Sequence, residues 1–430
     1  MTEDRFDAIV VGAGVAGSTA AYLLAKQGLQ VALIERGPYP GSKNLSGGVL
    51  YGRVLEQIFP GYWETAPVER CITNNLVTFL TEDAHFSLDF KTQAFQQTHN
   101  AYTVLRGKFD RWLAEQAEAA GAMLVAGIKV DGVILEERRI CGVQAGGEAI
   151  RADVVIAADG AFSFVTQAAG LREKPKPENT SIGVKHLIGL PREVIEERFH
   201  LNGNEGAAYA IVGWATRGIS GGGFLYTNLD SLSVGLVMKV DDLVQHQVKS
   251  GEMMDAFLRH PMLEGLLRGG KLLEYGAHIV PEGGLNAMPH LVMDGLLAIG
   301  DAAGLGINSG FAVRGMDLAI GSALAAAEAV VEAKAGQDFS AASLNAYPRK
   351  LEQSYVMQDM RTYRRTPGFF ENPRLFTLYP ELLSTLMTHI YEENAQPKPR
   401  LASLLRQSAR ECHAPLADLL KDTLEGMRAL

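Results

Sequence analysis

Three glycines and one acidic residue near the N-terminus have the types and spacing that dinucleotide binding requires. Gly12, Gly14 and Gly17 follow an apolar run at residues 7–11, and Glu35 ends a second apolar run about 20 residues further on. Glycine at these positions permits a tight turn, close approach of the backbone to a pyrophosphate, and close packing of a helix on a strand. The helix start offers N–H groups to the phosphates, and Glu35 can accept the ribose hydroxyls. The pattern predicts a dinucleotide site; the alternative is a glycine-rich turn without a ligand.

A second carboxylate, Asp301, follows another apolar run at residues 295–300. The Ala-rich residues 314–335 predict a long helix soon after it. A carboxylate at a strand end suits the ribityl hydroxyl of FAD, and a helix that starts at Gly315 and Met316 can face the electron-rich pyrimidine end of the flavin. We therefore expect FAD rather than a mobile nicotinamide alone; the alternative is that Asp301 only caps a helix.

The composition excludes several classes of protein. The chain has 430 residues, of which 47% are hydrophobic and 21% charged, as in globular rather than disordered or coiled-coil proteins. Its net charge of −9 argues against binding to nucleic acid. Cys71, Cys141 and Cys412 lie too far apart for a zinc site or an iron–sulfur cluster, and three thiols that cannot all pair indicate a reducing compartment.

The N-terminus and the hydropathy predict a cytoplasmic or peripheral protein. Residues 1–5 include Glu3 and Asp4 and lack the basic segment of a signal peptide. The sequence has no apolar stretch of about 18 residues or more, the length that spans a bilayer.

Two more segments carry motifs. Residues 104–114 place Arg106 at a predicted helix start, and residues 157–163 contain Asp159 and Gly160. With the glycine segment and the Asp301 segment, they resemble the FAD segments of the glutathione-reductase-like flavoprotein superfamily, in its hydroxylase-type branch. The resemblance implies that Arg106 contacts FAD; for Asp159 we prefer a turn residue to a pyridine-nucleotide contact. The cofactor-binding residues predicted so far are Gly12, Gly14, Ala16, Gly17, Glu35, Arg36, Arg106, Asp159, Gly160, Gly300, Asp301, Gly304, Gly315 and Met316.

Five further segments narrow this resemblance. They are Gly-Ser-Lys-Asn-Leu-Ser-Gly-Gly at 41–48 and residues 182–185, 221–226, 274–284 and 310–317. They are similar to the electron-transfer-flavoprotein–quinone oxidoreductases, and the whole chain most resembles the Fix-type branch, found in nitrogen-fixation and carnitine-linked operons. The resemblance adds Lys43, Ser46, Gly47 and Gly48 to the predicted cofactor-binding residues.

The family resemblance implies a function and partners. It implies an FAD-dependent oxidoreductase that accepts electrons from α- and β-type subunits of an electron-transfer flavoprotein and passes them to a membrane quinone. In Fix-type systems this path is implied to be the downhill arm of electron bifurcation, whose other arm supplies reductant for nitrogen fixation. The chain would then be peripheral on the inner face of the cell membrane. The flavin supplies the redox chemistry, so we assign no catalytic acid or base.

The cysteines mark a departure from the mitochondrial-type members of this family, which carry a cysteine-rich 4Fe–4S segment at the C-terminus. After Pro367 this chain has only Cys412, whereas a cluster needs four ligands. We expect flavin without a cluster and, from the resemblance, a separate small ferredoxin-like iron–sulfur subunit.

The predicted fold is α/β, with a discontinuous Rossmann-type FAD-binding domain of the glutathione-reductase/hydroxylase type. Short β-rich runs separated by glycines between residues 176 and 270 predict an antiparallel substrate domain laid over the isoalloxazine. From Phe339 the chain is predicted to be helical, with prolines interrupting the helices. The predicted division is 1–80, 100–175 and 270–335 for the FAD-binding domain, 81–99 and 176–269 for the substrate or quinone domain, and 336–430 for the helical C-terminal region.

Some residues allow two interpretations. Lys185 lies either near the flavin or substrate or on the solvated outer face of a sheet. His278 is better explained as a core histidine bonded to backbone than as a site residue. For membrane contact, the cations and aromatic residues between 361 and 379 are a weaker candidate than the surface at residues 224–226, because a quinone must reach the flavin from lipid.

Two other functions remain as alternatives. An NAD(P)H-dependent flavin hydroxylase or a geranylgeranyl-reductase-like enzyme could use the same scaffold, and NAD(P)H would then reduce the flavin directly. The chain could also be a non-catalytic assembly subunit in which FAD is structural, and its flavin would then accept electrons from no partner.

Overall fold

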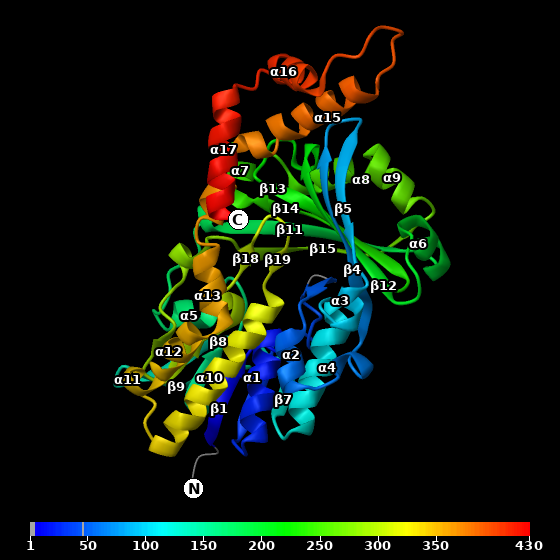
Figure 1. Ribbon diagram of the computed structural model, residues 1–430. Helices are drawn as coiled ribbons and strands as arrows, with labels where there is room; N and C mark the ends of the chain where they lie inside the picture. The colour runs from blue at the N-terminus through cyan, green and yellow to red at the C-terminus, as the bar shows by residue number, and fades with distance from the viewer. Residues whose placement is uncertain (1–4, 45–46) are drawn as a thin grey trace.

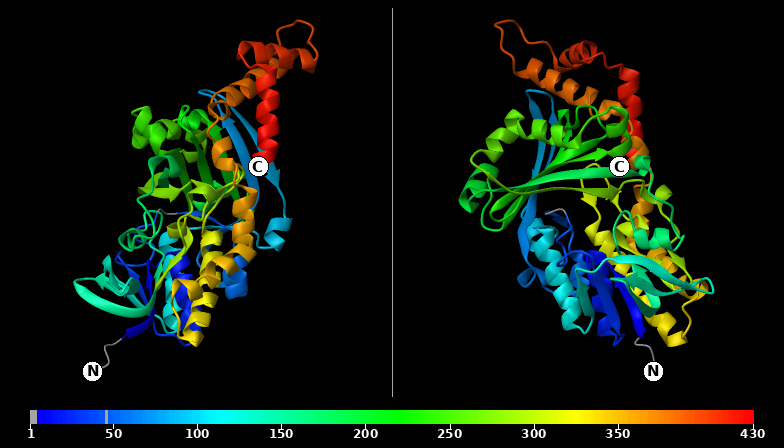
Figure 2. Two further views of the ribbon diagram at one scale, coloured as in Figure 1. Left: turned by 90° about the vertical axis from the view of Figure 1, so that its left-hand side faces the viewer. Right: turned by 180° about the vertical axis from the view of Figure 1, so that it is seen from behind.

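The computed structural model describes residues 5–44 and 47–430, so Ser46 among the predicted cofactor-binding residues lies outside the described residues. Two β-sheets lie one above the other in Figure 1, with the N-terminus at the bottom and the last helices at the top. The views in Figure 2 show the same arrangement from the side and from behind. Both sheets use strands from distant parts of the sequence, so a site between them combines segments far apart in the chain.

The lower sheet has a parallel centre. Its described strands are β1 (Arg5–Val11), β2 (Val31–Glu35), β7 (Met123–Ala126), β8 (Val130–Glu136), β9 (Arg139–Ala145), β10 (Glu148–Ala157), β16 (Val292–Met293) and β17 (Leu296–Ala298). The order is β16-β17-β10-β1-β2-β7, and every pair from β17 to β7 is parallel. β1 and β2 are continuous apolar runs because parallel strands are buried on both faces.

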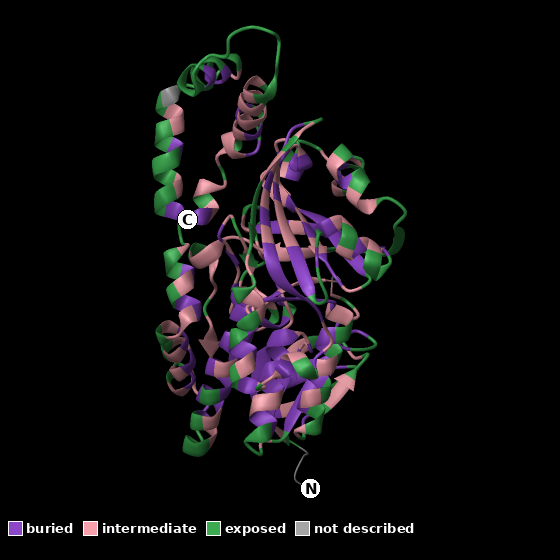
Figure 3. Ribbon diagram, turned by 45° about the vertical axis from the view of Figure 1, so that its right-hand side comes forward, coloured by how far each residue is buried: buried purple, intermediate pink, exposed green. Residues whose placement is uncertain are grey.

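Three helices pack together beside this sheet: α1 (Val15–Lys26), α4 (Arg106–Ala119) and α10 (Met316–Gly336). The predicted helix after the first glycine segment and the predicted helix at residues 314–335 are both confirmed. Alanine and glycine dominate the buried face of α10, so its backbone can lie close to α1. Figure 3 shows this lower half as the most deeply buried part of the molecule.

The upper sheet is mixed. Its described strands are β3 (Gly48–Leu50), β4 (Val68–Leu80), β5 (His85–Lys91), β6 (Tyr102–Val104), β11 (Thr180–Gly189), β12 (Glu205–Gly213), β13 (Gly221–Thr227), β14 (Ser231–Lys239) and β15 (Lys271–Pro281). The order is β15-β11-β14-β13-β12-β4-β6-β3, and β5 pairs with β4. The predicted antiparallel pairing is confirmed except at β12 and β4, which are parallel because the chain crosses the lower sheet between them.

The strands do not follow the predicted division at residues 80 and 270. β3, β4 and β6 come from segments assigned to the FAD-binding domain, yet they pair within the upper sheet, as does β15. An apolar alternation suits either sheet, and only the tertiary pairing decides between them. The division of the chain into domains stays a prediction.

The two faces of the upper sheet are different. Even-numbered residues of β14 from Leu232 to Met238 are fully buried in a hydrophobic core, whereas Val237 and Lys239 face the lower sheet. The helices that contribute to this core are α6 (Arg192–Phe199), α7 (Val240–Gln245), α8 (Ser250–Leu258) and α9 (Pro261–Leu267).

The C-terminal region is helical, as predicted. It comprises α11 (Ala341–Leu344), α12 (Ala346–Gln353), α13 (Tyr355–Thr362), α14 (Thr366–Phe369), α15 (Leu378–Tyr391), α16 (Leu401–Glu411) and α17 (Leu416–Ala429). Pro367, Pro373 and Pro380 lie in first turns, where the missing N–H costs no helical hydrogen bond. Within the described ranges, no helix is both long and apolar enough to cross a membrane.

Short elements complete the fold. They are α2 (Arg53–Ile58), α3 (Ala94–Gln97), α5 (Phe164–Ala168), the hairpin of β18 (Ile307–Asn308) and β19 (Val313–Arg314), and the 3-10 turns η1 (Tyr62–Glu64), η2 (Pro177–Asn179), η3 (Trp214–Thr216), η4 (Gly284–Ala287), η5 (Gly300–Ala303) and η6 (Pro373–Leu375).

Candidate active site

A cavity of about 1080 Å³ lies between the two sheets. Its walls are the carboxyl ends of β1 and β2, the lower face of the upper sheet, the β18–β19 hairpin and residues 360–376. Ligands of parallel sheets bind at the carboxyl ends of the strands, and the volume exceeds the roughly 300–1,000 Å³ of typical small-molecule sites. The cavity is therefore large enough for a dinucleotide and a second ligand.

Most of the predicted cofactor-binding residues line this cavity. They are Gly12, Gly14, Ala16, Glu35, Arg36, Lys43, Gly47, Gly48, Arg106, Asp159, Gly160, Asp301, Gly315 and Met316. Gly17 and Gly300 lie behind the wall, where a Cβ would overlap Gly12 O or approach the Cβ of Ala16 to 2.9 Å. Gly304 borders a second, smaller cavity. Contact of each residue with the cofactor itself stays a prediction.

The first glycine segment brings three elements together. Gly12 has φ +101°, and a Cβ there would lie 2.5 Å from Ala158 O at the end of β10. Gly17 allows α1 to lie directly against the backbone of Gly12. As a result α1 begins at the cavity, and no side chain caps its first turn. Its N–H groups and positive dipole are available to an anionic ligand.

A second helix start reaches the same cavity. α10 follows Gly315 and also lacks a side-chain cap. Arg314 holds this start in place, because its guanidinium lies 2.8 Å from Asp317 and 2.6 Å from Asp359 on α13. Two uncapped helix starts thus border one cavity, as the predicted phosphate and pyrimidine contacts require.

Hydrogen bonds fix the orientations of two predicted contacts. The carboxylate of Glu35 accepts the N–H groups of Ala13 at 3.0 Å and Gly37 at 2.7 Å, which leaves acceptor capacity for ribose hydroxyls. The guanidinium of Arg106 makes two hydrogen bonds to Asp110, at 2.7 and 2.9 Å, so it cannot swing away from the cavity wall.

Asp159 is the turn residue that we preferred. It accepts the hydroxyl of Ser163 at 2.7 Å and the N–H of Val165 at 3.0 Å, and so holds the start of α5. Both hydrogen bonds are local, so Asp159 has a structural role in its own turn.

Lys185 is buried beside the cavity and does not lie on the solvated outer face of the sheet. Its side chain is 3% exposed, its Nζ donates to Gly47 O, and it lies 5.8 Å from the ring centroid of Phe224. The neighbouring strands place Gly235 and Gly276 directly opposite, which leaves room for the lysine. Burial, followed by the nearby charge of Arg106, lowers the pKa of Lys185 to about 7.

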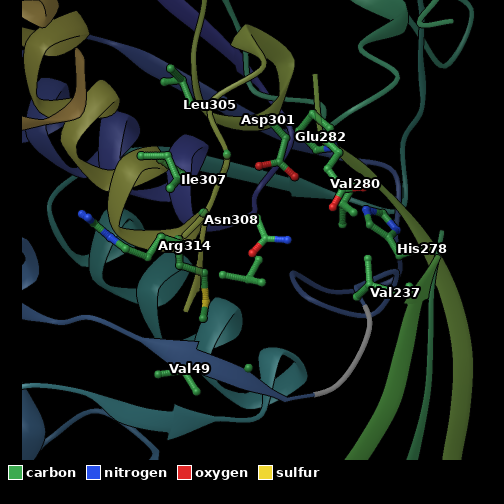
Figure 4. Close-up of a pocket in the computed structure, with 18 of the residues that line it drawn as sticks. Val49, Val237, His278, Val280, Glu282, Asp301, Leu305, Ile307, Asn308 and Arg314 are labelled. Atoms are coloured by element: carbon green, nitrogen blue, oxygen red, sulfur yellow. The ribbon is translucent and has the colours of Figure 1, made fainter. Parts of the chain in front are cut away.

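His278 is not the core histidine that the sequence suggested. It lines the cavity near Asp301, and Figure 4 shows these two residues with Glu282 and Asn308 around an open centre. Burial lowers the pKa of His278 and raises that of Asp301, and the attraction between the two charges opposes both shifts. The register of β15, which the sequence does not reveal, turns His278 toward the cavity.

The predicted membrane surface at residues 224–226 is also wrong. Leu225 is fully buried in the core of the upper sheet. Phe224 and Tyr226 stack at 5.0 Å and line the cavity. The sequence placed these residues on a lipid-facing surface, but β13 lies in the middle of the sheet, so its side chains point into the core or into the cavity.

The motifs did not point to several polar residues of the cavity, among them Lys239, Glu282 and Asn308. The sequence could have indicated Glu282 as a site residue, because Glu282 is an ionisable residue at a strand end and is followed directly by Gly283 and Gly284. Lys239 and Asn308 reach the cavity only through the tertiary fold.

The cavity fits FAD by its chemistry. It combines two uncapped helix starts, a glycine segment without side chains and a carboxylate held for ribose. The start of α1 and the glycine segment match phosphates, the start of α10 matches an electron-rich ring edge, and the carboxylate matches ribose hydroxyls.

Replacing Lys185 by Met should change the pH dependence of stability. Between about pH 7 and pH 10 the unfolded lysine holds a proton that the folded one has lost, so the free energy of unfolding of the wild type rises with pH by up to about 1.4 kcal/mol per pH unit. The K185M variant lacks this slope, and its advantage over the wild type should be largest near about pH 6 and shrink by about pH 9.

Denaturant unfolding at several pH values measures this difference. The matched control is Lys249→Met, because the Lys249 side chain is 81% exposed and should give no such slope. An equal difference for K185M at both ends of the pH range would contradict a buried, readily deprotonated Lys185.

Comparison with known proteins supports this interpretation of the site. Residues 5–201 match the FAD binding domain family, residues 181–280 the ubiquinone-binding domain of ETF-QO, and residues 366–430 the C-terminal domain of the ETF-QO/FixC family, where ETF-QO denotes electron-transfer-flavoprotein–quinone oxidoreductase. Among solved structures, a geranylgeranyl bacteriochlorophyll reductase-like protein from Thermoplasma acidophilum is 22% identical with TM-score 0.72, covering 97% of this chain and 99% of that chain. This likeness shows the shared fold.

Full-length relatives give the family. The probable electron transfer flavoprotein-quinone oxidoreductase YdiS of Escherichia coli K12 is 47% identical, and protein FixC of the same strain 45%, each over 100% of both chains. Protein FixC of Bradyrhizobium diazoefficiens is 37% identical over 93% of both chains. The chain is therefore an FAD-dependent oxidoreductase and belongs to the ETF-QO/FixC family.

Proposed function

We propose that this protein accepts electrons from an electron-transfer flavoprotein and passes them through FAD to a membrane quinone. The observation that carries the proposal is a continuous row of residues across the upper sheet. In successive strands, direct cross-strand partners are Lys185, Gly235, Phe224, Ala210, Val77 and Leu88.

This row joins the buried site to the surface. Its inner end is Lys185, which is 3% exposed, and its outer end is Leu88, which is 55% exposed. Five strand spacings of about 4.8 Å make it roughly 24 Å long. All its members except Gly235, which the ring of Phe224 covers, line the cavity, so the row forms an apolar track along the cavity wall. An apolar track of this length suits a prenylated quinone tail better than a small polar substrate.

In the proposed function, residues of the chain bind FAD and orient it in the cavity. FAD, when bound, supplies the ring that takes up and releases electrons. The starts of α1 and α10 hold its anionic and electron-rich ends, and Phe224 and Tyr226 keep water from the space above. Lys185, placed beside Phe224 at the inner end of the row, can stabilise negative charge there.

The outer end of the row supports membrane contact. Leu88 and Phe90 lie on the same face of edge strand β5 and are 55% and 58% exposed. Both also line the cavity, so its mouth has an apolar rim. Insertion of this rim into lipid would let a quinone enter without crossing water. We propose a peripheral position on the inner face of the cell membrane, as the family resemblance implies.

The partners proposed beyond the quinone come from the family. Names of the relatives connect them with electron-transfer flavoprotein and with Fix proteins. We propose α- and β-type flavoprotein subunits as donor, a small ferredoxin-like iron–sulfur subunit as companion, and a place on the downhill arm of a bifurcating complex that supplies reductant for nitrogen fixation. A geranylgeranyl-reductase-like reaction is the second candidate, because that fold matches over 97% of this chain.

The electron donor separates these candidates. We expect the anaerobic FAD-loaded protein to stay oxidised with NADH or NADPH and to be reduced by an electron-transfer flavoprotein that has itself been reduced, because a relative that matches the full chain is named for an electron-transfer flavoprotein and not for a nicotinamide. The absorbance of oxidised flavin measures both reactions. Rapid bleaching by NADH alone would instead support the hydroxylase or reductase alternative.

Replacing Leu88 and Phe90 by Ser should weaken binding to liposomes at least about 10-fold, because two large apolar side chains each contribute about 1.5 kcal/mol or more when buried. Co-sedimentation with vesicles of bacterial lipid measures it. The matched control is Leu135→Ser, which removes an equally exposed leucine, 59%, from β8 in the lower sheet. Equal loss in both variants, or none in either, would contradict the proposed membrane surface.

A further inference from the structure

One ionisable side chain at the centre of the cavity has no part in the mechanism above. Glu282 directly follows β15, and Figure 4 shows its carboxyl directed toward the open centre, opposite Asn308. The hydroxyl of Ser181 donates to its Oε2. The side-chain oxygen of Asn308 accepts the N–H of Gly310 at 3.0 Å, so the amide group of Asn308 is left to donate to Glu282.

Polar groups continue from Glu282 to the outside of the molecule. Ser181 on β11 lies directly opposite Lys239 on β14, and such cross-strand Cβ atoms are about 4.5–5.5 Å apart. The Nζ of Lys239 lies 2.9 Å from the carboxylate of Glu371. Exposure rises along this path, from Ser181 at 0% through the Lys239 side chain at 16% to the Glu371 side chain at 63%.

The charges around Glu282 permit it to hold a proton. Burial raises the pKa of Glu282, whereas the hydrogen bond from Asn308 and the charge of Lys239 lower it. The other ionisable groups facing this part of the cavity are His278 on β15, Asp301 on η5 and, beyond Lys239, Glu371. Burial lowers the pKa of Lys239, but the hydrogen bond with Glu371 and the charges of Glu371, Asp241 and Asp242 outweigh burial and raise this pKa, so Lys239 regains a proton from water readily.

Resting on the function proposed above, we propose that Glu282 donates a proton to a quinone oxygen in this cavity and recovers a proton from water through Ser181, Lys239 and Glu371. Quinone reduction to quinol takes two electrons and two protons. Both electrons and one proton come with the reduced cofactor, and the second proton comes from Glu282. A water-excluding cavity needs such an internal donor.

The proton transfers balance. The O–H bond of Glu282 breaks as the quinol O–H bond forms, which leaves a carboxylate. The hydroxyl proton of Ser181 then moves to Glu282 while Lys239 gives a proton to Ser181, and Lys239 regains its proton from water at Glu371. The path returns to its first state with one proton taken from solution.

The first test uses Glu282→Gln. FAD-loaded protein reduced with one equivalent of dithionite is mixed with a short-chain ubiquinone, and flavin reoxidation is followed by absorbance. The E282Q variant should react about 100-fold more slowly or worse, since general acids contribute about 10²–10⁴-fold, and it should lose the dependence of the rate on the carboxyl's pKa. Binding of oxidised ubiquinone should stay within about 3-fold of the wild type, because glutamine preserves the shape of the site.

Glu178→Gln is the matched control. Glu178 is an exposed carboxylate on the rim of the same cavity and lies outside the proposed path. The E178Q variant should be reoxidised at the wild-type rate and with the wild-type pH profile. An equal slowing in both variants would mean that charge at the cavity, and not proton transfer from Glu282, sets the rate, and would overturn the proposal.

Two further measurements test the proton path without relying on the activity of the E282Q variant. Lys239→Ala should slow reoxidation, and added methylammonium should restore it by replacing the missing ammonium. Infrared difference spectra of the oxidised FAD-loaded protein should show a protonated carboxylic acid band that is absent from E282Q. Absence of rescue together with absence of the band in the wild type would overturn the proposal.

Failure of this inference and failure of the proposed function give different results. If the wild type does not reduce ubiquinone at all, the proposed function is wrong and the proton path falls with it. If the wild type reduces ubiquinone and E282Q does so at the same rate with the same pH profile, only the proton path is wrong.

Discussion

The close approach of backbone to backbone at the first glycine segment is the constraint on which the rest of the structure depends. Gly12 lies against the end of β10, and Gly17 lies against Gly12, so any side chain at either position would separate α1 from the lower sheet. That contact fixes where α1 begins and therefore where its N–H groups point. The cavity, the second helix start at Gly315 and the upper sheet are arranged around this point.

Burial of individual side chains in the cavity shifts their pKa values. Burial lowers the pKa of Lys185 to about 7 and raises the pKa values of Asp301 and Glu282. A lysine that can lose its proton, together with carboxyl groups that can retain theirs, is expected in a site that handles both electrons and protons. The row from Lys185 to Leu88 connects this site with an apolar rim, and in the proposed function it would join redox chemistry to a lipid-soluble acceptor.

The sequence alone predicted the local motifs well and the tertiary placements poorly. Glycine spacing and strand-end carboxylates located α1 and α10, and most of the predicted cofactor-binding residues line the cavity, because their chemistry depends on neighbours in sequence. His278 and Phe224 were misplaced because only strand register decides which face a residue takes. The pairing of β4 with β12, and the meeting of Lys239 with Glu371, depend on contacts between distant segments that no local pattern encodes.

Photoaffinity labelling tests the central claim, that one cavity holds the FAD and opens along the row to the membrane. The FAD-loaded protein on vesicles would be irradiated with a quinone that carries a photoreactive group on its tail, and the labelled peptides identified by mass spectrometry. We predict labels on the peptides of β4, β5 and β12 that contain Val77, Leu88 and Ala210, and their suppression by unmodified quinone. Labels confined to the lower sheet, or labels that unmodified quinone does not suppress, would contradict it.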